Sequence, residues 1–177
     1  MSETDRIWDQ LQRSFEGGDA WRCPSLRDLL AAVGAPQAAA RAIAGAPTIW
    51  ELVLHVSVHE DVARRRLLGE AVDTLPDEQA WPKPADPSAA AWLQAKLDFG
   101  EARRALRQAV ASFPEARLAE TVPGREYTFY VMLHGAIEHA LYHAGQVEML
   151  MLAQGVRPSA APMSGHVVPT RGDRGSS

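Results

Sequence analysis

The spacing of apolar residues along this chain is helical almost throughout, and proline or glycine interrupts it at a few points. No stretch of any length alternates apolar and polar residues as a half-buried strand does. The longest break, residues 72–87, holds four prolines, which cannot sit inside a helix. The pattern predicts an all-α fold in which a long crossover joins the second and third main helices.

Local end signals refine the positions of these helices. Thr48 and Glu51 form a capping box, in which each side chain accepts a hydrogen bond from the other's backbone N–H. Asp86 before Pro87 predicts an N-cap followed by a proline at the first helical position. Four long and two short helices are therefore expected, at residues 5–15, 25–33, 37–43, 49–69, 87–113 and 128–154.

The length of 177 residues favours one domain, which we expect to be a four-helix bundle over residues 1–158. Residues 159–177 are rich in Ser, Gly and Pro, and are expected to form a disordered or loosely packed tail. The net charge is −4 and no basic stripe is present, so no nucleic-acid partner is expected.

The cellular compartment is suggested by a lone cysteine and by the N-terminal residues. Cys23 has no second cysteine to pair with, which fits a reducing environment. The first ten residues do not resemble a signal peptide, and no apolar run approaches the ~20 residues of a membrane span. A cytoplasmic protein without membrane contact is the expectation.

Histidines are the residues most suggestive of chemistry. His139 and His143 are four residues apart, so both imidazoles share one face of the last helix and can converge on a metal ion. His134 lies about 140° round the helix from His139, which places it outside such a site. His166 falls in the expected tail.

A third ligand is expected from the helix that begins after Thr48. His55 lies in an apolar stretch, whereas His59 precedes a charged run where that helix is expected to turn towards solvent. His55 is therefore the preferred ligand, and His59 is interpreted as a supporting or surface residue. The simpler alternative for His55 is a hydrogen-bonded core histidine.

Two segments resemble signatures of the DinB/YfiT-like superfamily: residues 134–147 and residues 48–55. The crossover and the turn at residues 122–124 are also similar, so the resemblance covers residues 7–155. It implies a four-helix bundle with a long crossover. It further implies one divalent metal ion, commonly zinc or nickel, held by His55, His139 and His143. Members are often dimers.

The family resemblance also bears on the reaction. Some members transfer bacillithiol or mycothiol, others are maleylpyruvate isomerases or parts of ergothioneine-pathway enzymes, and many have no assigned reaction. Three neutral imidazoles leave the metal strongly electrophilic, so that a bound thiol becomes a thiolate. We expect transfer of a low-molecular-weight thiol to an electrophilic small-molecule substrate. A metal-dependent hydrolase and a non-catalytic metal-binding or ligand-binding bundle remain alternatives, and no catalytic protein residue is assigned.

Overall fold

The computed structural model describes residues 1–16 and 25–157 and confirms the all-α prediction. No strand occurs in these residues, and a single isolated bridge joins Thr121 and Thr128. The predictions for Cys23, His166 and residues 159–177 lie outside the described residues. The helices are α1 (Glu3–Glu16), α2 (Leu26–Ala31), α3 (Ala35–Ala39), α4 (Ile49–Leu67), α5 (Asp77–Ala80), α6 (Ala89–Ala111), the 3₁₀-helix η1 (Glu115–Ala119) and α7 (Phe129–Ala153).

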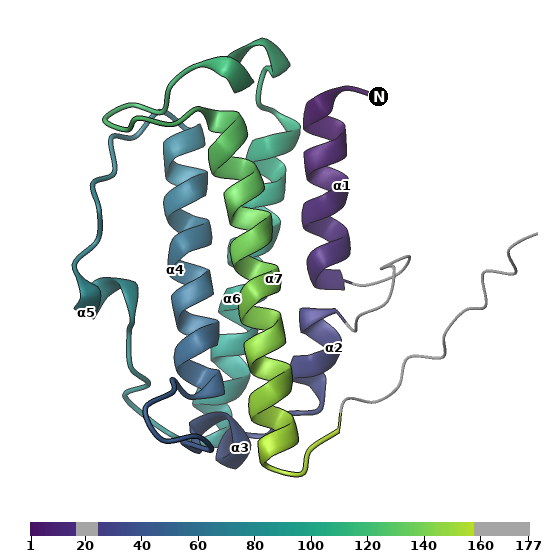
Figure 1. Ribbon diagram of the computed structural model, residues 1–177, viewed down its shortest axis with the longest axis vertical. Coiled ribbons are helices and arrows are strands. Elements are labelled where there is room, and N and C mark those ends of the chain that lie inside the picture. The colour runs from purple at the N-terminus through teal and green to yellow at the C-terminus, as the bar shows by residue number, and fades with distance from the viewer. Residues whose placement is uncertain (17–24, 158–177) are drawn as a thin grey trace, which may run out of the picture.

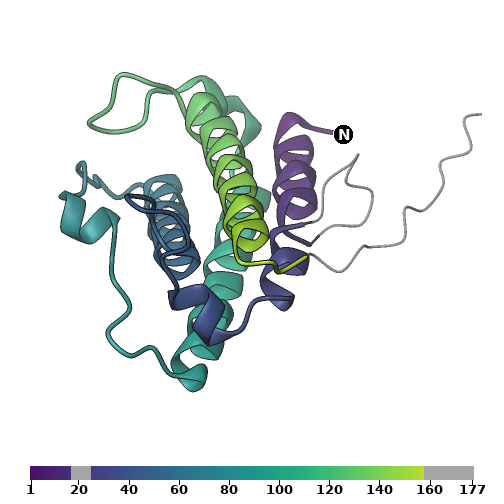
Figure 2. The ribbon, with the colours of Figure 1, turned by 60° about the horizontal axis from the view of Figure 1, so that its bottom comes forward.

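The four longest helices lie side by side (Figure 1). Helix α4 contacts both α6 and α7, and α1 contacts the same two helices. The short helices α2 and α3 lie at one end of this group, as the tilted view also shows (Figure 2). Within the described residues, no helix is long and apolar enough to cross a membrane.

Side-chain caps fix the helices that carry the histidines. At the start of α4, Thr48 Oγ1 accepts from Glu51 N at 3.1 Å and Glu51 Oε2 accepts from Thr48 N at 2.7 Å, which confirms the capping box. At the start of α7, Thr128 Oγ1 accepts from Val131 N. Helix α7 ends before Gly155, whose φ of 71° lies in the left-handed region that glycine adopts without strain.

Two predicted helix positions were wrong. The N-cap of α6 is Ser88, whose hydroxyl accepts from Ala91 N, and Asp86 instead accepts from the Ser88 N–H and hydroxyl. The Ser88 hydroxyl caps the helix in place of the Asp86 carboxylate because Ser88 directly precedes the first helical turn. The segment expected at residues 37–43 forms α3, which starts earlier because Pro36 suits a first helical turn.

The connection between α4 and α6 contains one turn of helix that the prolines concealed. This turn, α5, follows Pro76 and lies beside α4 (Figure 1). It contacts α4 directly. The connection therefore returns to the body of the molecule at Ala80 and Trp81, and these two residues meet the histidines described below.

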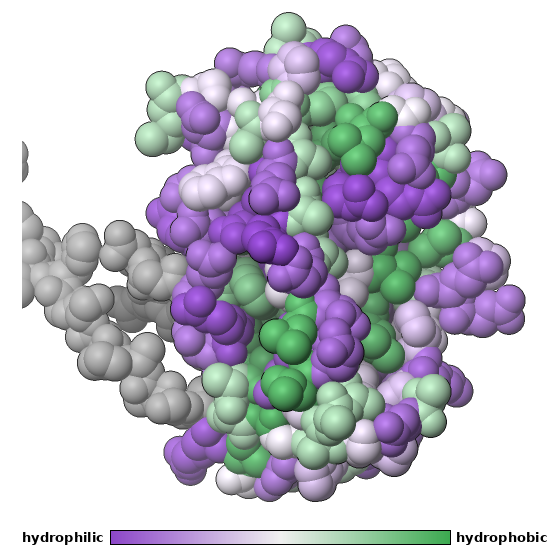
Figure 3. Space-filling model, turned by 180° about the vertical axis from the view of Figure 1, so that it is seen from behind, coloured by the Kyte–Doolittle hydropathy of each residue, from purple (hydrophilic) through white to green (hydrophobic). Residues whose placement is uncertain are grey.

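Apolar side chains fill the space between the long helices in two clusters. One is built around Trp50, Trp92 and Phe99, and the other around Leu106 and Phe129. On the face seen in Figure 3, hydrophilic residues cover much of the surface and apolar patches lie between them. Both clusters include residues of α4, α6 and α7, so together they hold α4 against the other two helices.

A buried ion pair lies within this interior. Arg103 of α6 contacts Glu60 of α4, and both side chains are 2% exposed. The guanidinium also donates to Ser14 Oγ and to the Leu11 carbonyl oxygen, which connects α1 to the pair. The expectation that α4 turns towards solvent after residue 59 was therefore wrong, because α1 and α6 cover that side of the helix.

Candidate metal centre

Four histidine rings come together between α4 and α7. His55 and His59 lie one turn apart on α4, and His139 and His143 lie one turn apart on α7. The His55 ring centroid is 4.9 Å from both the His139 and His143 centroids, and the two rings of α7 are 4.5 Å apart. The predicted i, i+4 pairs therefore face each other across the α4–α7 contact.

His139 is at the centre of this group. Its Nε2 lies 3.0 Å from His55 Nε2 and 3.1 Å from His143 Nε2. Nitrogen ligands at 2.0–2.1 Å from a tetrahedral metal ion lie about 3.4 Å from one another. Each of these two distances is thus close to the spacing between two ligands of one small cation.

Hydrogen bonds on the far side of two rings fix their tautomers. His55 Nδ1 lies 2.7 Å from the Ala80 carbonyl oxygen, and His143 Nδ1 lies 2.7 Å from Gln146 Oε1. Both oxygens can only accept, so both Nδ1 atoms carry hydrogen and both neutral rings present an Nε2 lone pair. This is the arrangement in which carbonyl partners orient histidine ligands of metals.

These tautomers do not give a satisfied hydrogen-bond network around His139. A neutral His139 carries at most one hydrogen on Nε2, so it can donate to His55 or to His143 but not to both. At least one close pair of Nε2 atoms would then be two facing lone pairs. A cation at the centre would accept the lone pairs of all three Nε2 atoms at once. The arrangement therefore fits a divalent metal site better than it fits a group of hydrogen-bonded core histidines.

The electrostatic environment keeps these rings neutral. Burial, followed by the neighbouring rings of His143, His59 and His55, lowers the pKa of His139 to about 3. Burial is also the main cause that lowers the pKa of His55 and of His143, although the bonds to Ala80 and Gln146 act in the opposite direction. Neutral imidazole is the form that binds a metal.

His59 lies closer to this group than the sequence interpretation placed it. Its ring is half-buried, 4.5 Å from the His55 centroid and 4.9 Å from the His139 centroid. His55, His59 and His139 each offer a nitrogen within 4.8 Å of the other two. Of the two interpretations of His59, supporting residue or surface residue, the second was wrong, because the half-buried ring packs beside two rings of the cluster.

Trp81 is a site residue that the sequence did not identify. Its ring stacks on His55, with centroids 3.6 Å apart and an interplanar angle of 10°, and it meets the His143 ring edge-on. The side chain remains 37% exposed. The Trp81 ring and the Ala80 carbonyl therefore hold His55 from two directions, and Trp81 forms one wall of the histidine cluster.

Other residues considered from the sequence lie outside the cluster. His134 is half-buried on α7, where its ring contacts Tyr130 and its Nε2 lies 4.0 Å from a Glu3 carboxylate oxygen. Glu138, which precedes His139, is exposed. Gln146 lies beside the cluster, where its side-chain oxygen accepts from His143.

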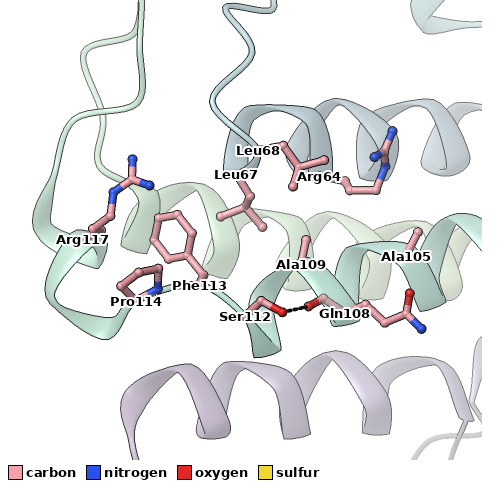
Figure 4. Close-up of a pocket in the computed structure, with 10 residues that line it drawn as sticks. All are labelled: Arg64, Leu67, Leu68, Ala105, Gln108, Ala109, Ser112, Phe113, Pro114 and Arg117. Atoms are coloured by element: carbon pink, nitrogen blue, oxygen red, sulfur yellow. Dashed lines mark hydrogen bonds between the residues drawn. The ribbon is translucent and has the colours of Figure 1, made fainter.

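A pocket of about 530 Å³ lies between the C-terminal parts of α4 and α6 (Figure 4). Its lining includes Arg64 and Arg117 with an apolar floor that contains Leu67 and Phe113, and it includes none of the four clustered histidines. Both arginines are already paired with carboxylates, Arg64 with Asp61 and Arg117 with Glu120. This pocket offers no additional group to the histidine cluster.

Comparison with known proteins identifies a family that includes the histidine cluster in its matched region. A sequence-family model of the DinB superfamily matches residues 23–147, which is more than half of the chain. The matched region contains all four clustered histidines. Curated proteins give no match, and solved structures give none. On the strength of the family match, the chain belongs to the DinB superfamily.

Proposed function

We propose that this protein binds one divalent metal ion, zinc or nickel, through His55, His139 and His143. The observation that carries the proposal is the meeting of three Nε2 atoms that cannot all be satisfied by hydrogen bonds among themselves. The architecture would be the four-helix bundle of the family, with residues 68–88 as its crossover. Residues 1–158 would form the bundle domain and residues 159–177 a tail.

The residues around the three ligands have definable tasks. The Ala80 carbonyl and the Gln146 amide oxygen hold the Nδ1 hydrogens of His55 and His143, so that each Nε2 lone pair points to the centre. Trp81 stacks on His55 and limits rotation of that ring. A divalent ion held by neutral imidazoles supplies Lewis acidity, which lowers the pKa of a bound thiol or water.

The reaction proposed is transfer of a low-molecular-weight thiol to an electrophilic small-molecule substrate. The ligand set keeps the full positive charge of the ion, and a thiol bound to it would lose its proton near neutral pH. The sulfur then forms a bond to the electrophilic carbon, and the leaving group departs with the electron pair of its own bond. Within the described residues, the histidine cluster offers no serine or cysteine nucleophile to compete with an external thiol.

A screen of thiols tests this reaction. Metal-loaded protein would be mixed with bacillithiol, mycothiol, glutathione or cysteine and a reactive electrophile, beside His143→Ala protein. We expect a rate above background with at least one thiol, lost in the variant. If fully metallated protein gives no rate with any thiol but cleaves esters or amides, the hydrolase alternative replaces this one. Metal binding without either activity would favour a non-catalytic protein.

A homodimer is also proposed, in keeping with the family resemblance. Helix α7 leaves several large apolar side chains exposed in the single chain. Light scattering of purified protein tests the proposal, and a monomer at high concentration would contradict it. The exposed side chains of α7 are Tyr130, Val131, Leu141, Tyr142, Met149 and Leu152.

A further inference from the structure

The four clustered histidines form two triplets that share one pair. His55 and His139 belong to both triplets; His143 completes one and His59 completes the other. In ring-centroid distances the two triplets are alike. The centroid of the His59 ring is 4.5 Å from that of His55 and 4.9 Å from that of His139. The centroid of the His143 ring is 4.9 Å from that of His55 and 4.5 Å from that of His139. By centroid distance His59 thus lies as near the shared pair as His143 does, and it is His59 that completes the group whose nitrogens all lie within 4.8 Å of one another.

The two residues differ in what holds their rings. His143 Nδ1 is fixed by Gln146, as His55 Nδ1 is fixed by Ala80. In residues 1–16 and 25–157, no hydrogen bond engages either ring nitrogen of His59. The His59 ring is also only half-buried. His59 is thus the one imidazole of the four that can turn either nitrogen towards the centre without breaking a protein hydrogen bond.

The backbone places His59 where such a turn is possible. It lies four residues after His55 on a regular α4, so both side chains leave the helix on the same stripe. The next residue, Glu60, points about 100° round the helix and is anchored by Arg103, which fixes the rotation of α4 about its axis. A change of side-chain rotamer is the movement by which we expect His59 to reach the centre.

We propose that His59 is a fourth protein ligand of the metal, so that the resting centre is a four-histidine site. This inference rests on the proposed metal site and adds a residue to it. A tetrahedral ion with four protein ligands is closed, whereas one with three keeps a position for water or substrate. His59, the ligand without an anchoring hydrogen bond, is the one that can leave to open the site. The coordination position available to a substrate would then be the one that His59 vacates.

The test uses Co(II) as the probe, because its visible absorption reports the number and type of ligands in a site that also binds zinc. Wild-type protein, His59→Ala, His59→Gln and His134→Ala would each be titrated with Co(II) at neutral pH. The His134 variant is the matched control, since His134 is a half-buried histidine outside the cluster. The glutamine variant keeps a polar side chain of similar length, and far-UV circular dichroism verifies that each variant is folded.

The expected result is a four-nitrogen Co(II) spectrum in wild type and in His134→Ala. Both His59 variants should show a shifted spectrum with an oxygen ligand in place of one nitrogen. Their Co(II) affinity should fall by more than about tenfold, the lower end of what loss of an outer-shell partner costs a metal site.

An unchanged spectrum and affinity in the His59 variants, together with loss of binding in His143→Ala, would overturn the fourth ligand and leave the three-histidine site intact. Absence of Co(II) and Zn(II) binding in folded wild-type protein would overturn both proposals.

Discussion

The hydrogen bond from His143 to Gln146 offers a sharp test of how the ligands are oriented. Gln146 lies one turn after His143 on α7, and its Oε1 is 2.7 Å from Nδ1. Replacing Gln146 with leucine removes the acceptor while keeping the volume of the side chain. His143 could then adopt the other tautomer or turn its ring away, and both changes take the Nε2 lone pair off the centre.

The magnitude follows from the role of such partners. Losing an outer-shell hydrogen bond to a histidine ligand weakens metal binding by about 10–100-fold, which corresponds to about 1.4–2.8 kcal/mol. We expect Gln146→Leu to raise the dissociation constant for zinc by that factor, measured by competition with a chromophoric chelator. Gln146→Glu keeps an acceptor and should retain wild-type affinity or exceed it.

A surface glutamine supplies the control. Gln94 is exposed on α6 and its amide donates to Asp98, so Gln94→Leu removes a comparable side-chain bond far from the histidines. Zinc affinity should be unchanged in that variant. If Gln146→Leu binds zinc as tightly as wild type, the tautomer argument for His143 is refuted, whatever the metal content of the protein.

Three further outcomes concern stability of the metal-free protein, measured by chemical denaturation. Arg103→Leu should lower the free energy of unfolding by about 3–5 kcal/mol because it leaves the Glu60 carboxylate buried and uncompensated. Adding Glu60→Leu should restore most of the loss. Equal stability of Arg103→Leu and wild type would contradict a stabilising role for the buried ion pair. The free energy of unfolding should fall as the pH drops below 6.5 towards 3, because the unfolded chain takes up protons at histidine before the native cluster does. His139→Gln should flatten this dependence. Identical pH profiles of the variant and wild type would contradict the reasoning. Gly145→Ala should stabilise the protein by about 1 kcal/mol, since a Cβ at this exposed helical position meets nothing within 4 Å, and a loss of stability would indicate a contact absent from the single chain.

Local chemistry explains why much of the fold could be predicted from the sequence. The capping box at Thr48 acts within three residues, so the start of α4 was readable from a short motif. Competition between neighbouring caps was less readable: Asp86 and Ser88 are both good N-caps, and the structure uses the second.

The residues that were misjudged depend on contacts between distant segments. Glu60 was expected near solvent, but Arg103, 43 residues later, is buried against it. Trp81 and Ala80 reach His55 only because the connection between α4 and α6 returns to α4, and no spacing rule predicts that return. The helical spacing of His139 and His143 predicted a shared face correctly, whereas the exclusion of His59 relied on a mistaken burial pattern.

The metal content of the purified protein tests the central claim most directly. His139 contributes the nitrogen that lies 3.0 Å and 3.1 Å from its two partners, so its removal should disrupt the centre more than any change outside it. Protein made without a histidine tag should carry about one equivalent of divalent metal by elemental analysis after zinc or nickel loading and dialysis. His139→Ala should lose most of it, while His134→Ala and His166→Ala should keep it. Equal metal content in His139→Ala and wild type, or none in folded wild type, would contradict the account.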